Sequence, residues 1–377
     1  MSHQKHAQLK SNLKGHFGHH ELAILGTTCE EVEQLVHVLA ESSSGKYRLG
    51  YVDADHKSLD GAQKSPLIQH LAQVWTNHQQ WEVTVAGKSN AYERKLTGQH
   101  LDLVLINGNH EAGLQQMVVL NEKKINSLRK RWPALTDVLV ILEPNETSPD
   151  LILLKEDILK VFPQAACFRQ EDKQGWLEWF QTFMLTNRPA LQGLILAGGR
   201  SERMGQDKGA LDYHGRPQRE YITQLLESVV SSVIISGRSG QFNSEEVKNI
   251  LTDEFLDLGP YGALLTAFKK YPEVAWLVVA IDMPKVDIRT LEYLINHRNP
   301  AAIATAFINP LDGFPDPTLS IWEPKSYYRL LQFLSLGISC PRKVLINSDT
   351  ELLTCPEPEW LTNINTPEEL KVFRNSK

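Results

Sequence analysis

Short apolar runs alternate along the chain with segments in which apolar residues recur at helical spacing. In the first half, strands are predicted at Glu21–Gly26, Tyr47–Asp53, Leu101–Ile106 and Asp137–Leu142, and a helix at Cys29–Glu41. Buried strands that alternate with amphipathic helices are typical of parallel sheets covered by helices. The first half is therefore predicted to be an α/β domain.

The alternation restarts in the second half, after a proline-containing stretch over residues 143–191 that is predicted to form turns and one aromatic helix around Trp176–Phe183. The predicted elements beyond it are strands at Leu191–Leu196, Val233–Ser236, Trp276–Ile281 and Ala301–Ala306, and a helix from about Gln218. We expect a polar tail over residues 1–19 and two doubly wound, mainly parallel α/β domains over residues 20–187 and 188–377.

Composition and charge narrow the class of protein. Of the 377 residues 42% are hydrophobic, and no apolar run is long enough to span a membrane. The polar, His-rich start lacks the apolar core of a secretion signal, which predicts a cytoplasmic protein. A net charge of −6 without a long Lys/Arg stripe argues against nucleic acid as a partner. Four isolated cysteines indicate neither a zinc site nor disulfides, and no redox chemistry is expected.

The strongest chemical signal is the segment LILAGGRSERMGQDKGALDYHGRP at residues 194–217, where a strand leads into Gly198 and Gly199. Adjacent glycines let backbone N–H groups surround a triphosphate, and Arg203 and Lys208 supply positive charge. The alternative is a tight turn with two solvated bases. The segment is neither a Walker loop nor a GxGxxG dinucleotide loop.

Two further turns accompany this loop. An apolar strand ends in Asp282, which is well placed to hold Mg²⁺ against phosphate oxygens, although a turn or N-cap aspartate would look the same. Gly259, Pro260 and Gly262 form a tight turn into a helix, whose N–H groups could receive part of the nucleotide. A plain capped helix start is the alternative there.

Together these motifs resemble the molybdenum cofactor guanylyltransferases, the MobA family, over about residues 191–377. The matching segments are LAGGRSERMGQDKG, GPYGAL, VAIDMP and the closing NINTPEEL at residues 363–370. The resemblance implies a Rossmann-like nucleotidyltransferase fold. Related cytidylyl- and uridylyltransferases share the glycine loop but usually not the closing segment, which favours the guanylyl branch.

The resemblance also implies roles for matching residues. Leu196, Ala197 and Gly198 would line the guanine and ribose site, and Asp253 matches an acidic nucleotide-binding position. Lys208 would contact the phosphates, and Asp282 would bind Mg²⁺.

Two positions depart from the family pattern. Ser236 stands near the base where relatives often carry Asn, which weakens any inference about guanine selection. Phe314 and Asp316 replace the Arg and His of an acceptor-side Arg-x-His-Pro-Thr segment, so the acceptor chemistry stays open.

In the first half, LAILGTT at residues 22–28, GYVDADH at residues 50–56 and LDLVLINGNHE at residues 101–111 resemble the P-loop proteins called MobB, which accompany the guanylyltransferases in molybdenum cofactor synthesis. The P-loop position of this half is degenerate, because Val32 replaces the lysine and Glu30, Glu31 and Glu33 would repel phosphate. The later SSSGK run at residues 42–46 is predicted to be a helix-terminating turn.

Polar residues gather after the predicted strand ends of the first half. They are Asp53, Asp55, His56, Asn109 and His110, which we interpret as solvated loop residues, with a metal or pterin site as the alternative.

The resemblance implies that GMP passes from GTP to molybdopterin or Mo-molybdopterin with release of pyrophosphate. The acceptor phosphate is already an anion, so positioning and charge neutralisation by Lys208, Arg203 and Mg²⁺ on Asp282 suffice, without a Ser-His-Asp system. Other proteins of molybdenum cofactor synthesis are candidate partners. The alternatives are a cytidylyl- or sugar-phosphate nucleotidyltransferase and a non-catalytic nucleotide- or pterin-binding carrier. Sequence leaves the base, the metal state of the pterin and the oligomer open.

Overall fold

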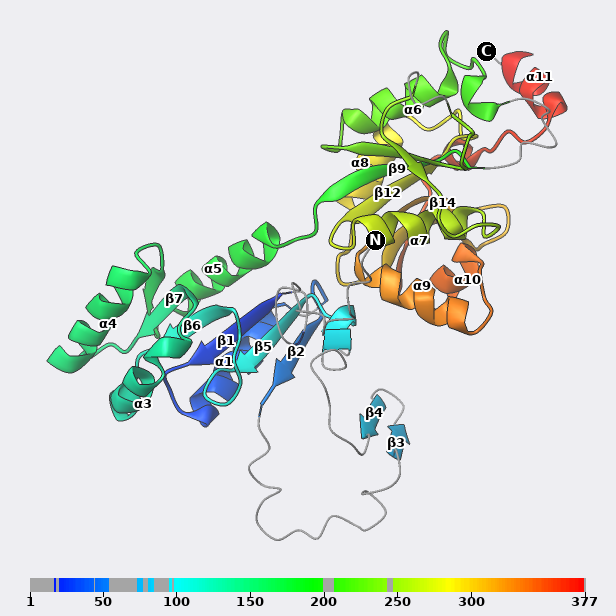
Figure 1. Cartoon of the computed structure of the whole chain (residues 1–377). Helices are drawn as coiled ribbons and strands as arrows, with labels where there is room; N and C mark the ends of the chain where they lie inside the picture. The colour runs from blue at the N-terminus through cyan, green and yellow to red at the C-terminus, as the bar shows by residue number, and fades with distance from the viewer. Residues whose placement is uncertain are drawn as a thin grey trace, which may run out of the picture. The chain divides into compact units, whose positions relative to one another are not determined.

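The computed structural model consists of two compact units, Met1–Asn187 and Arg188–Lys377 (Figure 1). The residues that it describes are 17, 20–43, 45–53, 73–76, 81–84, 95–96, 98–198, 207–242 and 247–375. Among these residues no helix is long and apolar enough to cross a membrane.

The first unit is built on a six-stranded sheet in which every strand pair is parallel. Its strands in spatial order are β2 (Leu49–Val52), β5 (Leu103–Asn107), β1 (Glu21–Leu25), β6 (Gln115–Val119), β7 (Asp137–Glu143) and β8 (Ala166–Arg169). A separate two-stranded sheet pairs β3 (Gln73–Thr76) with β4 (Trp81–Thr84).

Helices cover both faces of the six-stranded sheet (Figure 1). On one face α1 (Cys29–Ser42) and α5 (Lys173–Thr186) bury Val32, Leu39 and Phe180. On the other, α3 (Ile125–Lys130) and α4 (Pro149–Val161) bury Leu128, Leu151 and Ile158. The predicted α/β class is confirmed. The aromatic helix predicted around Trp176–Phe183 is confirmed as α5, whereas the turns predicted for the rest of residues 143–191 are wrong where α4 and β8 lie.

The second unit contains a seven-stranded sheet that is parallel except at one strand. Its order is β11 (Ile250–Thr252), β10 (Val233–Gly237), β9 (Leu191–Leu196), β12 (Ala275–Ala280), β14 (Pro315–Trp322), β13 (Ala304–Ile308) and β15 (Thr350–Thr354). Strand β14 runs antiparallel to both neighbours.

Helices again cover both faces of this sheet. One core lies under α6 (Gln218–Glu227) and α8 (Ile288–Asn296), and the other under α7 (Pro260–Lys270), α9 (Lys325–Ser335) and α10 (Pro341–Ile346). The helix α11 (Pro367–Asn375) packs Leu370 and Phe373 on Leu211 and Tyr213, in a small separate cluster.

Three neighbouring parallel strands, β10, β9 and β12, end at the same edge of the second sheet. Residues that follow parallel strands at one edge are brought together there, where open α/β sheets bind ligands. The chain after these strands carries Gly198, Arg238 and Asp282. Topology alone therefore gathers the segments around Gly198 and Asp282 at one edge.

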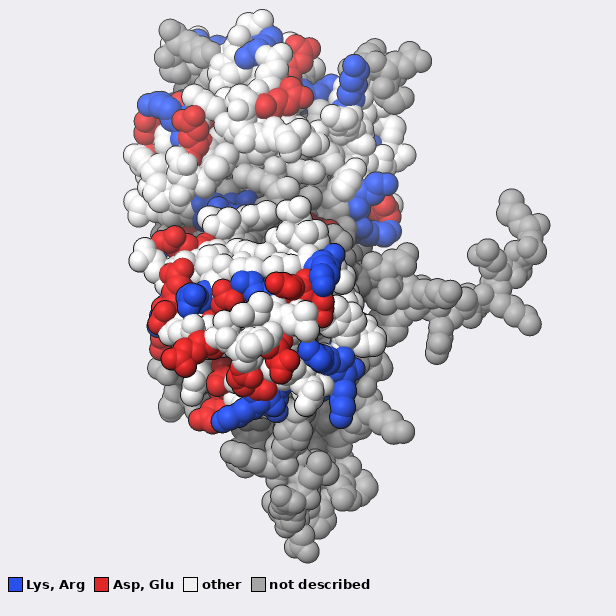
Figure 2. Space-filling model, turned by 90° about the vertical axis from the view of Figure 1, so that its left-hand side faces the viewer, with Lys and Arg blue, Asp and Glu red and all other residues white. Residues whose placement is uncertain are grey.

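Figure 2 shows one face of the molecule, on which basic and acidic side chains are intermingled. Over the described residues drawn on this face, no continuous basic area is visible.

Candidate functional site

Lys208, Asp282 and Asn365 form a polar centre at the carboxyl edge of the second sheet. The Lys208 ammonium Nζ donates to Asp282 Oδ2 at 2.8 Å and to Asn365 Oδ1 at 2.8 Å. The side chains of Lys208 and Asp282 are only 16% and 18% exposed, so water screens their attraction weakly. Three segments far apart in sequence thus meet around one cation.

The turn that carries Asp282 is fixed by contacts on several sides. Its backbone carbonyl accepts a hydrogen bond from Ile364 N at 2.9 Å. Two residues on, the Pro284 carbonyl lies 2.8 Å from His214 Nε2, and His214 stacks on Tyr221. These contacts hold the aspartate in place before any ligand arrives, which lowers the ordering cost of binding.

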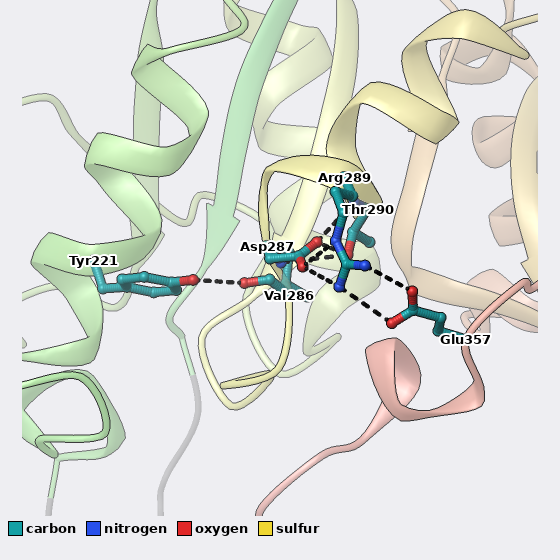
Figure 3. A network of polar contacts seen from close by, with 6 residues as sticks. All are labelled: Tyr221, Val286, Asp287, Arg289, Thr290 and Glu357. Atoms are coloured by element: carbon teal, nitrogen blue, oxygen red, sulfur yellow. Dashed lines mark hydrogen bonds and ion pairs between the residues drawn. The ribbon is translucent and has the colours of Figure 1, made fainter.

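The same turn continues into a polar network that begins helix α8 (Figure 3). Tyr221 donates its hydroxyl to the Val286 carbonyl at 3.0 Å, and Asp287 and Thr290 form a capping box. Arg289 bridges Asp287 and Glu357 with ion pairs of 2.9 and 3.0 Å. The network anchors the chain where it leaves the turn and enters α8.

Asn365 is positioned by the start of helix α11. The Glu369 carboxylate accepts hydrogen bonds from the backbone N–H groups of Asn365 at 2.6 Å and Thr366 at 3.1 Å. In return Glu369 N donates to the Thr366 hydroxyl at 3.2 Å, which completes a reciprocal cap. The NINTPEEL segment therefore caps α11 and holds Asn365 within hydrogen-bond distance of Lys208.

Gly198, Ser236 and Asp253 meet at the same sheet edge, where Gly198 follows β9, Ser236 lies near the end of β10 and Asp253 follows β11. A Cβ on Gly198 would lie 2.8 Å from Asp253 Oδ2, so only glycine fits there without displacement. Ser236 donates its hydroxyl to Asp253 Oδ1. Burial raises the pKa of the Asp253 carboxyl, while the Ser236 hydrogen bond and the Arg238 charge lower that pKa.

The backbone of the glycine loop is held from three directions. Leu196 O accepts from Ile281 N at 3.1 Å, and Ala197 N donates to Ser236 O at 3.1 Å. The Gln241 side chain donates to Ala197 O at 2.7 Å. Leu196 and Ala197 therefore lie at the sheet edge together with Asp253 and Ser236.

Other predicted site residues lie apart from these contacts or outside the described residues. Gly259 has a φ of 54° and forms the N-cap of α7, where its carbonyl accepts from Gly262 and Ala263. Gly199 and Arg203 lie outside the described residues. On the acceptor side, Asp316 is buried and accepts from Thr318 N at 2.8 Å, whereas Phe314 is about half exposed.

The sequence analysis assigned no role to Asn365 or Gln241, although both touch the candidate site. Asn365 lies in the NINTPEEL segment, so the resemblance of this segment to the family could have pointed to it. Gln241 lies in a loop without a recognisable motif, and the sequence carried no comparable signal for it.

The side chains at the carboxyl edge of the second sheet include one that could bind a divalent metal ion. Among the described residues no three His, Cys, Asp or Glu side chains are grouped to hold an ion. Mg²⁺ is usually bound by one or two carboxylates and completes its shell with waters and substrate phosphates. Asp282, partly exposed at the edge where β9 leads into Gly198, fits that requirement as a single protein ligand.

At the position predicted to be a degenerate P-loop, a side chain of the protein takes up nearby polar groups. Glu31 Oε2 accepts from the Thr27 hydroxyl and from Asn121 Nδ2, the latter at 3.0 Å. The SSSGK run ends helix α1, with Ser43 as C-cap and Gly45 at φ 74°, so its prediction as a helix-terminating turn is confirmed. His56 and Asp55 lie outside the described residues.

Comparisons with known proteins match this architecture. The MobA-like NTP transferase domain matches residues 193–350. A molybdenum cofactor guanylyltransferase of Pseudomonas putida is 31% identical over 189 residues, which cover 49% of this chain and 97% of that protein. A molybdenum cofactor biosynthesis bifunctional protein of Synechocystis is 33% identical over 181 residues. That match covers 48% of this chain and 52% of the Synechocystis protein, so this chain spans about half of that protein's length.

Among solved structures, molybdopterin-guanine dinucleotide biosynthesis protein A from Archaeoglobus fulgidus aligns with a TM-score of 0.43 and 20% identity. That alignment covers 49% of this chain and 97% of the solved chain.

Proposed function

This chain belongs to the molybdenum cofactor guanylyltransferase family, and we propose that it transfers GMP from GTP to the phosphate of molybdopterin or Mo-molybdopterin. The observation that carries the proposal is the contact of Lys208 with both Asp282 and Asn365. It places a cation and a carboxylate at the carboxyl edge of the sheet, beside the glycine loop. The MobA-like domain makes the chain a nucleotidyltransferase, and GTP and the pterin are the substrates implied by the relatives.

Lys208 has a direct part in this reaction. Its ammonium is held between Asp282 and Asn365, so it needs no rearrangement of long side chains to face a polyphosphate. A fixed positive charge stabilises the charge that grows on pyrophosphate as it leaves, and such preorganised groups are worth several kcal/mol in enzymes, about 3–4 for one donor. Arg203, in the same loop segment, would add a second cation.

Asp282 would hold Mg²⁺, and the bound metal would supply charge neutralisation between the triphosphate and the acceptor. The carboxylate has a second duty in the protein alone, because it keeps Lys208 oriented. The acceptor phosphate is an anion at neutral pH, so the chain needs no general base to create the nucleophile. Catalysis then consists of holding two anions together.

The nucleoside would bind where Leu196, Ala197 and Gly198 pass Ser236 and Asp253. Gly198 leaves no side chain between the loop backbone and the Asp253 carboxylate. That carboxylate can accept hydrogen bonds from a base or ribose, and donors of this kind are plentiful on guanine. The Gln241 contact to Ala197 O fixes the loop from the opposite side.

We also propose that the first unit is a degenerate MobB-like domain that does not bind triphosphate. Glu31 accepts the hydroxyl and amide donors that a phosphate would need, and its negative charge repels polyphosphate. Fusion of this unit to the transferase raises the local concentration of whatever it carries for the second unit.

The test uses full-length protein, Mg²⁺, molybdopterin and each of the four nucleoside triphosphates, with pyrophosphate release as the readout. We expect release with GTP only. Release mainly with CTP would assign the chain to the cytidylyl alternative. Binding of GTP with no release on addition of pterin would favour a carrier.

A further inference from the structure

A cysteine, a histidine and an aspartate meet at the carboxyl edge of the first sheet, outside the transferase site. Strands β2, β5 and β1 are neighbours in that sheet (Figure 1), and the chain after them carries Asp53, His110 and Cys29. Cys29 Sγ lies 3.1 Å from His110 Nε2. The same His110 nitrogen lies 3.9 Å from Asp53 Oδ1.

The elements around this cluster fix its members. Cys29 is the first residue of α1, whose N-cap Thr28 accepts a hydrogen bond from Glu31 N. Asp53 Oδ2 accepts from Asn107 Nδ2 at 3.0 Å and from the Tyr51 hydroxyl at 2.8 Å. The buried Asn107, at the end of β5, therefore holds the Asp53 carboxylate in place. The same Asn107 side chain accepts a hydrogen bond from the backbone N–H of Asn109, which precedes His110.

Although the isolated cysteines predicted no redox chemistry, we propose that Cys29 and His110 form a nucleophilic thiol site that exchanges with the S–S bond of a small disulfide lacking negative charge. A thiol at a helix N-terminus beside an imidazole is the setting in which protein thiolates act as nucleophiles. Asp53 stabilises the imidazolium that forms when His110 takes the thiol proton. Glu30 and Asp53 make an anionic disulfide a poor partner.

The exchange balances without a further oxidant. The Cys29 proton moves to His110 Nε2, and the sulfur attacks one sulfur of the disulfide. A new S–S bond forms to Cys29 as the old one breaks, and the leaving thiolate takes the proton from His110. Cys29 is oxidised, and the released sulfur is reduced.

The chain provides its own control in Cys167, which is more exposed than Cys29. Partial burial raises the pKa of the Cys167 thiol, and its sulfur contacts only a backbone carbonyl at 3.8 Å among the hydrogen bonds described for it. If exposure alone set reactivity, Cys167 would react before Cys29.

The experiment treats full-length protein at neutral pH with limiting dithiodipyridine, which is uncharged, and measures the rate of mixed-disulfide formation at each cysteine by mass spectrometry. We expect Cys29 to react about tenfold or more faster than Cys167, which is modest for assistance by a positioned base. His110→Gln keeps a hydrogen-bond donor near the sulfur but cannot act as the base. It should slow Cys29 at least about tenfold and leave Cys167 unchanged.

Equal or faster reaction of Cys167 in the unchanged protein would overturn the proposal without any variant. So would a Cys29 rate that His110→Gln leaves intact, because the imidazole would then be only a packing partner. Cys167, in the same unit as His110, should keep its rate in the variant and reports that this unit is folded, and Cys340 reports the same for the second unit.

Discussion

At the residue scale, Lys208 has two partners that do different things for it. Asp282 neutralises the ammonium, whereas Asn365 contributes only a neutral oxygen. Both partners come from segments that resemble family motifs, so sequence alone could predict the pair Lys208 and Asp282. It could not assign Asn365, because a polar residue within a motif gives no indication of which atom it contacts.

Substitution of Asp282 and Lys208 should show what each charge contributes to transfer. Asp282→Asn keeps the size of the side chain but removes the charge proposed to hold Mg²⁺, so transfer should be abolished while the fold persists. Lys208→Ala should slow transfer on the order of 10²-fold, as expected for loss of one preorganised charge. Pyrophosphate release measures both. Near-normal release by Asp282→Asn would remove the metal assignment.

The elevated pKa of Asp253 predicts a dependence of stability on pH. Because burial raises the folded-state pKa above the unfolded value, the folded state binds more protons between these two values. The contribution of Asp253 to stability is therefore present below the unfolded pKa and falls as the pH rises through the folded pKa.

Asp253→Asn should remove this loss and weaken GTP binding. The quantity to measure is the melting temperature of Asp253→Asn minus that of the unchanged protein. We expect this difference to be larger at neutral pH than at a pH near the ordinary pKa of an aspartate. A difference in melting temperature that does not change with pH would show that Asp253 carries no such penalty.

At the element scale, buried parallel strands were the easiest elements to predict. Strand β9 begins and ends as expected at Leu191–Leu196, because a buried strand is a continuous apolar run with few alternatives. Strand β14, with two prolines in PDPTLSIW, carries no such signal. Its antiparallel pairing with β12 and β13 depends on long-range contacts that no local pattern reveals.

The cap of α11 offers a test of how an element positions a side chain. Thr366→Ala removes the hydroxyl that accepts from Glu369 N, which should cost about 1 kcal/mol of stability. Because Asn365 is adjacent, transfer should also slow. The matched control is Ser148→Ala, which removes the cap of α4 in the first unit.

The control variant should lose a similar amount of stability in a thermal or denaturant melt but keep its transfer rate. Equal rates for Thr366→Ala and Ser148→Ala would show that the cap stabilises α11 without positioning Asn365.

At the scale of the whole molecule, two α/β units share one chain, and we propose a phosphate site at the sheet edge of the second unit alone. In the first unit, the Glu31 carboxylate accepts hydrogen bonds from the Thr27 hydroxyl and the Asn121 amide, so these donors are already used. In the second, the Lys208 ammonium lies with Asp282 and Asn365 at the sheet edge where β9 leads into Gly198. If the proposal holds, the side chains of the loops, and not the sheet architecture, decide which unit binds nucleotide.

Calorimetric titration of full-length protein with GTP and Mg²⁺ should therefore find one site per chain. Lys208→Ala should weaken that site, since it removes the cation from the only edge proposed to bind triphosphate. A second equivalent of GTP, or full-affinity binding that persists in Lys208→Ala, would assign a nucleotide site to the first unit.

The contact between Lys208 and Asn365 joins residues 157 positions apart. During synthesis on a ribosome, the last strand of the second sheet, β15, has emerged once Thr354 is clear, yet Asn365 has not. The sheet can therefore close around a site that still lacks one partner of its lysine. Chains that end just after β15 would lack Asn365, and also Trp360 and Leu361 of the core under α6 and α8, so we expect them to bind substrate poorly.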